Sequence, residues 1–292
     1  MEVHQLRYFC AVARMGSFTR AAAEQGVAQP SLSQQILKLE AEMGAPLFER
    51  LGRSVRLTQC GELLLPQAHA ILRQFADARH SVQGMLTGVQ GRLKVGSIPT
   101  VMPYFVAPRV PEFLREYPQV DLQLVENTTA RLVEGLQSGD LDLAILGLPL
   151  SSPDMVCCEL FREPILLAVP PGHRLSGLER VDLKEVRQER VLLLREGHCF
   201  RDDALATCRK ARMKPNAVFE SDQFASIIAL VEAGAGVSFV PAMAAAAAQG
   251  CRLVPLQPES FRRIGYAHVP RQFRPPAQKA FVGWLKRSAA ER

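Results

Sequence analysis

The fold of the first part of the chain is decided by residues 16–36, which read GSFTRAAAEQGVAQPSLSQQI. Gly16 and Gly26 are typical of helix ends, because glycine readily adopts the left-handed conformation that terminates a helix. Ser31 and Gln34 fit a capping box, so we expect a helix to begin near Ser31. The stretch therefore predicts two helices joined by a tight turn.

Apolar residues at helical spacing lie on both sides of that turn and predict a third helix before it. Residues 47–57, LFERLGRSVRL, predict two short extended arms around a turn at Gly52. Three helices followed by a basic hairpin are the pattern of a winged helix-turn-helix. The apolar residues expected to pack inside this unit are Leu6, Phe9, Cys10, Ala13, Leu32, Ile36 and Leu39.

The helix that begins near Ser31 and the hairpin carry side chains that suit a DNA interface. Glutamine can bond an adenine edge through two hydrogen bonds, and arginine can contact phosphate or the minor groove. Three packed helices with a solvated polar face remain the alternative, because such patterns are degenerate. The candidate DNA-binding residues are Gln29, Pro30, Ser31, Ser33, Gln34, Lys38, Arg50, Arg53 and Arg56.

The composition limits the class of protein. The chain has 292 residues, which suits two domains, and its 48% hydrophobic and 22% charged residues exclude a collagen or a disordered chain. The net charge of +6 permits a polyanionic partner. No stretch has the length and apolarity of a membrane span, and the N-terminus lacks a secretory pattern, so we expect a cytoplasmic protein with reduced thiols and no membrane partner. No metal-ligand, phosphate-loop or hydrolase motif occurs, so we expect no cofactor, no metal and no enzyme activity.

The rest of the chain predicts a linker helix and an α/β part. Residues 58–86 have a helical pattern, Pro66 is expected to kink it or to mark its first turns, and Gly84, Gly88 and Gly91 predict a flexible connection after it. From residue 91 on, short apolar runs alternate with helical patterns, which predicts parallel sheets with helices on both faces. We therefore expect a winged domain at 1–58, a linker helix and hinge at 59–90 and a regulatory domain at 91–292.

The chain resembles the LysR family of transcriptional regulators. The resemblance rests on LRYFCAVA at 6–13, GSFTRAAA at 16–23, AQPSLSQQI at 28–36 and GAGVSFVP at 234–241. It implies a linker helix that dimerises and a regulatory domain of two α/β subdomains, like a periplasmic binding protein. Subdomain I would comprise residues 91–163 and 265–292, and subdomain II residues 164–264. The resemblance also implies a double-stranded DNA operator, RNA polymerase as a partner and a homodimer or homotetramer.

A second motif, EGHCFRDDALATC at 196–208, suggests redox chemistry. Cys199 has His198 and Arg201 nearby, and cationic neighbours lower the pKa of a thiol and favour the reactive thiolate. Peroxide oxidises such a thiol to a sulfenic acid, which a second thiol such as Cys208 can resolve as a disulfide. If the segment is helical, the two cysteines lie about 13 Å apart, whereas a disulfide needs Cα atoms within about 7 Å. Oxidation would then have to unwind the segment. Two unreactive, half-buried cysteines are the alternative.

The same motif resembles the peroxide-sensing, OxyR-type branch of the LysR family. The resemblance implies that Cys199 is peroxidatic and Cys208 resolving, and that their disulfide switches the oligomer and its DNA contacts. One departure is that this branch tends to carry an arginine before a proline after Ile264-Gly265, where this chain has Val269. The implied peroxide pocket comprises Thr100, Thr129, His198, Arg201 and Asp202.

Three functions follow from these patterns. The first is a DNA-binding regulator that senses hydrogen peroxide through Cys199. The second is a LysR-type regulator that binds a small organic effector between its subdomains, with Cys199 as a bystander; Val269 motivates it. The third is a thiol peroxidase or cysteine hydrolase that uses Cys199 and His198, which we favour least because the sequence shows no third orienting group.

Overall fold

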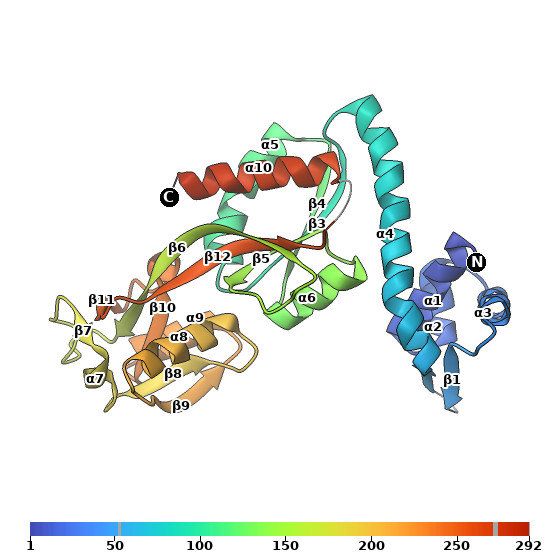
Figure 1. Ribbon diagram of the computed structural model, residues 1–292. Helices are drawn as coiled ribbons and strands as arrows, with labels where there is room; N and C mark the ends of the chain where they lie inside the picture. The colour runs from blue at the N-terminus through green and yellow to red at the C-terminus, as the bar shows by residue number, and fades with distance from the viewer. Residues whose placement is uncertain (52–53, 271–273, 292) are drawn as a thin grey trace. The chain divides into compact units, whose positions relative to one another are not determined.

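The computed structural model describes residues 1–51, 54–270 and 274–291. The chain divides into two compact units (Figure 1), which we describe separately. The first unit contains Met1–Leu86, and the second contains most of the residues from Thr87 on. In the described part of the chain, no helix combines the length and the apolarity needed to span a membrane.

The first unit is a three-helix bundle with a hairpin and a long helix, as the sequence predicts. Its core contains Leu6, Phe9, Leu32, Ile36 and Leu39, whereas Cys10 and Ala13 are only partly buried. The two hairpin strands pair antiparallel, from Phe48 opposite Leu57 to Leu51 opposite Ser54. The elements are α1 (Val3–Met15), α2 (Phe18–Gln25), α3 (Gln29–Met43), β1 (Phe48–Leu51), β2 (Ser54–Leu57) and α4 (Gln59–Thr87). Helix α4 continues through Pro66.

Helix α3 begins two residues earlier than the capping box predicts. Its N-cap is Ala28, which has extended backbone angles and offers no side-chain hydrogen bond. Pro30 lies in the first turn, where its fixed φ angle suits a helix start, and Ser31 is already inside the helix. The predicted ends at Gly16 and Gly26 are confirmed, with φ angles of 58° and 67°.

The second unit is built on one mixed sheet, in the order β4-β3-β5-β12-β6-β10-β8-β9, with β11 paired to β6 and β7 to β11. Its strands are β3 (Gly91–Ser97), β4 (Val120–Glu126), β5 (Leu143–Leu148), β6 (Val156–Val169), β7 (Val181–Asp182), β8 (Arg190–Leu194), β9 (Asn216–Ser221), β10 (Val237–Pro241), β11 (Arg252–Gln257) and β12 (Phe261–His268). Its helical segments are η1 (Met102–Val106), η2 (Ala107–Arg109), α5 (Val110–Glu116), α6 (Thr129–Ser138), α7 (Leu183–Val186), α8 (Cys199–Lys210), α9 (Phe224–Glu232), η3 (Ala242–Ala247) and α10 (Pro276–Ala290).

The prediction of parallel sheets is only partly right. Strands β3, β4 and β5 pair in parallel, and so do β8, β9 and β10. Strands β6 and β12, however, run antiparallel to each other and to their other neighbours. The short strand β7 pairs in parallel with β11. These two long strands connect the two halves of the unit directly, without an intervening crossover helix, so the βαβ rule does not apply to them.

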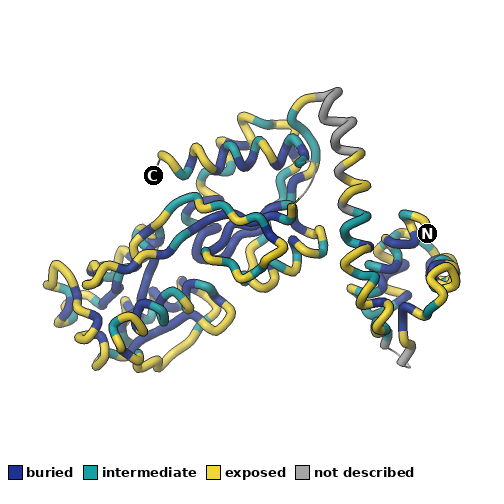
Figure 2. The backbone as a smooth tube through the Cα atoms, viewed as in Figure 1, coloured by how far each residue is buried: buried dark blue, intermediate teal, exposed yellow. Residues whose placement is uncertain are grey.

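Each half of the second unit has its own hydrophobic core. One core contains residues of β3, β5, β12 and α10, and the other contains residues of β8, β10, α8 and α9. Strand β6 pairs with β12 up to Pro164 and with β10 and β11 from Ile165 on. Figure 2 shows the buried segments along the central strands of both halves.

Candidate functional site

Cys199 is the first residue of helix α8, just after the turn that follows β8. Gly197 makes this turn with a φ angle of 96°, a left-handed conformation that side chains disfavour. His198 is the extended N-cap residue and is almost fully buried. The Cys199 sulfur therefore lies at the end of the helix where the unpaired N–H groups favour a negative charge.

A narrow pocket surrounds this thiol. Three segments line it: the turn between β3 and η1, the start of α6 and the first turn of α8. The pocket brings together four residues that the sequence singled out, namely Thr100, Thr129, His198 and Cys199. The complete lining is Ile98, Pro99, Thr100, Thr128, Thr129, His198, Cys199 and Phe200.

Arg201 and Asp202 do not line this pocket, contrary to the prediction. The Arg201 guanidinium donates to the Leu194 carbonyl at 2.9 Å and to Glu220 at 2.6 Å. Asp202 is exposed. For Arg201 the reason is helix geometry, because a position two residues after Cys199 turns away from it.

The cation beside the pocket is Arg262 of β12, which the sequence analysis missed. It is almost fully buried, and its Nε donates to Glu163 at 2.7 Å. Its Nη1 donates to the Thr100 hydroxyl at 2.9 Å and its Nη2 to the Thr100 carbonyl at 3.1 Å. The guanidinium carbon lies 5.0 Å from the centre of the Phe200 ring. Arg262 thus connects the Cys199 turn, the Thr100 turn and β6.

The departure expected at Val269 stays a prediction, although Arg262 supplies a buried cation beside the pocket. Val269 follows the end of β12 and packs against the core that contains β3, β5, β12 and α10. Arg262 lies seven positions before Val269, near the start of β12, and is buried like the five residues that end the strand. Burial does not alternate along this strand, so no local signal in the sequence indicates an inward-facing Arg262.

The pKa of the Cys199 thiol is raised from its ordinary value, contrary to the prediction from His198 and Arg201. Burial is the largest cause, and the Asp203 carboxylate adds to it. Arg262 opposes the shift, as do hydrogen bonds from Thr129 and from the Gly147 backbone. Apart from Cys199, the buried Thr129 hydroxyl has no hydrogen-bond partner among the described residues, so it can also bind a small polar ligand.

Gly147 on β5 makes room for the thiol. A methyl group at this position would lie 3.1 Å from the Cys199 sulfur and 3.5 Å from its Cβ. The first distance is shorter than ordinary van der Waals contact, so any larger residue would crowd the sulfur. The glycine therefore allows the first turn of α8 to pack against the sheet of the other half.

Cys208 lies in a different environment. It is fully buried in the core of the half that contains β8 and β10, and burial raises its pKa to about 11. Cys199 instead packs against the core that contains β3 and β5. Helix α8 is continuous between them, so their separation along its axis is about 13 Å. A bond between the two sulfurs requires α8 to unwind.

The candidate DNA-binding residues lie on α3 and on the hairpin. Ser33 is partly buried and accepts a hydrogen bond from the Gln29 amide at 2.9 Å. Of the hairpin arginines, Arg56 is exposed, Arg53 lies outside the described residues, and only the backbone of Arg50 is described. The exposed candidates on α3 are Gln29, Pro30, Ser31, Gln34 and Lys38.

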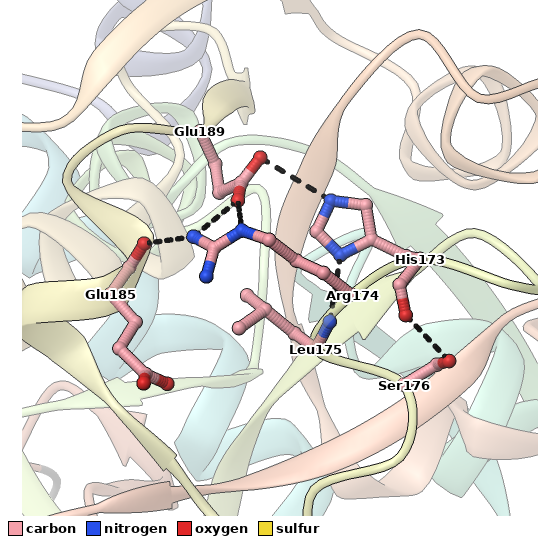
Figure 3. A network of polar contacts seen from close by, with 6 residues as sticks. All are labelled: His173, Arg174, Leu175, Ser176, Glu185 and Glu189. Carbon is pink, nitrogen blue, oxygen red and sulfur yellow. Dashed lines mark hydrogen bonds and ion pairs between the residues drawn. The ribbon is translucent and has the colours of Figure 1, made fainter.

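A polar network elsewhere in the second unit has a structural role (Figure 3). His173 accepts from the Leu175 backbone N–H through Nδ1 at 3.3 Å, and its Nε2 lies 3.3 Å from Glu189. Arg174 donates to the same Glu189 carboxylate at 2.8 Å. The network fixes the loop after β6 to the segment after α7. Among the described residues, no cluster of His, Cys, Asp and Glu has the composition of a metal site.

Comparisons with known proteins agree with this architecture. Residues 3–62 match the family model "Bacterial regulatory helix-turn-helix protein, lysR family", and residues 87–290 match "LysR substrate binding domain". The chain is 35% identical over 274 residues to a hydrogen peroxide-inducible genes activator of Dickeya chrysanthemi, covering 92% of this chain and 90% of the relative.

Two solved structures are also similar. A full-length OxyR variant from Pseudomonas aeruginosa has a TM-score of 0.80 at 32% identity, covering 99% of this chain and 94% of that one. Full-length CbnR in complex with its target DNA has a TM-score of 0.66 at 27% identity, covering 99% and 100%. The fold and the matched models define a helix-turn-helix protein with a ligand-binding domain. The chain belongs to the LysR family of bacterial transcriptional regulators.

Proposed function

We propose that this chain is a transcriptional regulator that senses hydrogen peroxide through reversible oxidation of Cys199. The observation that carries the proposal is the pocket in which this thiol meets Thr100, Thr129 and His198, with Arg262 beside it. Hydroxyl and imidazole groups can hydrogen-bond a peroxide molecule, and a cation stabilises the thiolate that attacks it. The relative named as a hydrogen peroxide-inducible genes activator supports this assignment.

The proposed reaction has two steps. The Cys199 thiolate attacks one peroxide oxygen, so that an S–O bond forms, the O–O bond breaks and the leaving hydroxide takes a proton to become water. The Cys208 thiol then attacks the sulfenic sulfur, forming the disulfide and releasing a second water. The second step requires α8 to unwind, because the helix holds the two sulfurs far apart. We propose that this refolding changes the oligomer and its DNA contacts.

The first unit supplies the DNA contacts in this proposal. The recognition helix is α3, with Gln29, Pro30, Ser31, Ser33, Gln34 and Lys38, and the hairpin adds Arg50, Arg53 and Arg56. The CbnR complex with DNA supports this assignment. A dimer or a dimer of dimers would present two such helices to half-sites one helical turn apart, or a multiple. RNA polymerase is the downstream partner that the family implies.

The alternative is a small organic effector, which Val269 motivates because it stands where the peroxide-sensing branch tends to carry an arginine. The buried cation Arg262 beside the pocket favours the peroxide proposal. The pocket around Cys199 is also narrow and lined by three threonines, which suits a ligand of a few atoms better than an organic acid.

Peptide mapping after oxidation tests the proposal. Reduced protein receives one equivalent of hydrogen peroxide, and cysteine oxidation is followed by mass spectrometry. We expect Cys199 to react faster than the partly buried Cys251 and to form a disulfide with Cys208. Cys199→Ser should abolish the response to peroxide while DNA binding persists. If Cys199 oxidises no faster than Cys251, peroxide is not the signal.

A further inference from the structure

Asp203 is an acidic residue that the proposed reaction does not use. It lies one helical turn after Cys199 on α8, so the two side chains project from the same side of the helix. It is partly buried, and Arg262 interacts electrostatically with both side chains. The carboxylate and the thiolate therefore share one cation.

The surroundings of Arg262 explain why this sharing matters. Three of its N–H groups are occupied by Glu163 and by the two oxygen atoms of Thr100. The Phe200 ring covers one face of the guanidinium. The single positive charge of Arg262 therefore interacts with the Glu163 carboxylate, the Asp203 carboxylate and the Cys199 thiolate.

We propose that Asp203 restrains the reactivity of Cys199 by competing with its thiolate for the positive charge of Arg262. This inference rests on the proposed function, since it makes Asp203 a residue that sets the peroxide sensitivity of the same thiol. Asp203 does not touch peroxide in this proposal. It acts through Arg262 and is a positioning residue.

The ionisation of Asp203 agrees with this role. Its pKa is raised to about 6, with burial as the largest cause; Arg262 opposes the shift, Asp202 and Glu163 add to it, and Lys210 lowers it. Asp203 is therefore mostly charged at pH 7.5 and disfavours the thiolate there. Reciprocally, a thiolate at Cys199 raises the pKa of Asp203, because electrostatic coupling between two sites acts equally in both directions.

The coupling predicts an unusual pH profile for the reaction of Cys199. Below about pH 6 Asp203 is neutral, and the logarithm of the rate rises with unit slope. Just above pH 6 the profile flattens to less than unit slope, because loss of the proton from Cys199 is coupled to partial protonation of Asp203. At higher pH unit slope returns. Asp203→Asn should rise with unit slope throughout, matching the wild-type protein below pH 6 and exceeding it above.

Removal of the Asp203 charge lowers the pKa of Cys199 and so increases the thiolate fraction. Nucleophilicity falls with pKa, so only part of this gain reaches the rate, and we expect an increase of about threefold at pH 8. Folding should not obscure the test. A carboxyl group whose pKa is raised by folding stabilises the protein only at low pH, so Asp203→Asn should be more stable than wild type above pH 6.

The experiment measures the rate of Cys199 modification from pH 5 to 8.5 with two reagents, hydrogen peroxide and iodoacetamide, resolved by peptide. Asp203→Glu keeps the charge and should retain the flattened region. Asp202→Asn removes a neighbouring but exposed charge and should retain it too. If Cys199 is alkylated but peroxide does not oxidise it, the proposed function fails. If Cys199 reacts with both reagents and Asp203→Asn gives the wild-type profile, only the competition for Arg262 is overturned.

Discussion

Arg262 joins parts of the chain that are distant in sequence. Its partner Glu163 lies 99 positions away and Thr100 lies 162 positions away. Glu163 in turn accepts from the Met243 backbone at 2.8 Å, in the other half of the unit. A buried carboxylate that keeps only one of its partners is costly, because little water can reach it. The Arg262–Glu163 pair therefore stabilises the fold, and Arg262 also favours the thiolate form of Cys199.

Arg262→Ala should destabilise the second unit by about 3–5 kcal/mol, since it leaves Glu163 buried without its cation. Equilibrium unfolding in urea measures this loss. The adjacent Arg263 is a matched control, because it is exposed and lies 3.6 Å from Glu159. Arg263→Ala should cost less than about 1 kcal/mol. Equal losses for the two variants would contradict the role of the buried pair.

Gly147→Ala should slow the reaction of Cys199 with peroxide, because the added methyl group lies 3.1 Å from the sulfur. Stopped-flow oxidation with the variant and the wild-type protein measures the rate. Gly177→Ala is the control, since nothing lies within 4 Å of a methyl group added there. An unchanged rate in Gly147→Ala would show that the thiol reacts from a different position.

Helix α8 sets the second step of the proposed reaction. Its continuous hydrogen bonds must break before Cys208 can reach Cys199, so the stability of the helix should limit disulfide formation. The first step needs no such opening. The two steps should therefore respond differently to a change in helix stability.

Ala206→Gly in α8 lowers helix stability by about 1 kcal/mol. It should speed disulfide formation about fivefold and leave sulfenic acid formation unchanged, as followed by quenched mass spectrometry. Ala229→Gly is the control, because it lowers the stability of α9 by a similar amount and this helix contains neither Cys199 nor Cys208. Acceleration by both variants would point to general loosening of the fold, and acceleration by neither would mean that helix opening is not limiting.

Features encoded by a few neighbouring residues could be predicted from the sequence, whereas contacts between distant residues could not. Gly16 and Gly26 end helices through their own backbone, so their roles are readable from the sequence. The motif around Cys199 is also contiguous. Ser31 misled the prediction because Ala28 and Pro30 start α3 without a side-chain cap. Arg262 was missed because its partners Thr100 and Glu163 are far away in the sequence.

The candidate DNA-binding residues all lie in the first unit, so charge changes on the second unit's surface should leave the salt dependence of DNA binding unchanged. Lys38→Ala should weaken DNA binding and reduce the slope of log affinity against log salt by about one for each protomer that contacts DNA. Binding titrations at several salt concentrations measure the slope. Lys286→Ala removes an equal charge from the exposed side of α10 and should leave the slope unchanged. Equal slope changes would mean that only net charge matters.

Strands β6 and β12 form a two-stranded ribbon that carries the chain between the two cores. Sliding one strand along the other would break several backbone hydrogen bonds at once, whereas such ribbons twist readily. In mechanical terms the ribbon is stiff in shear and soft in torsion. Strain released when α8 unwinds can therefore turn one half of the unit against the other without pulling the halves apart. The proposed Cys199–Cys208 disulfide would hold the rotated arrangement after the peroxide has been consumed, until a reductant cleaves the bond.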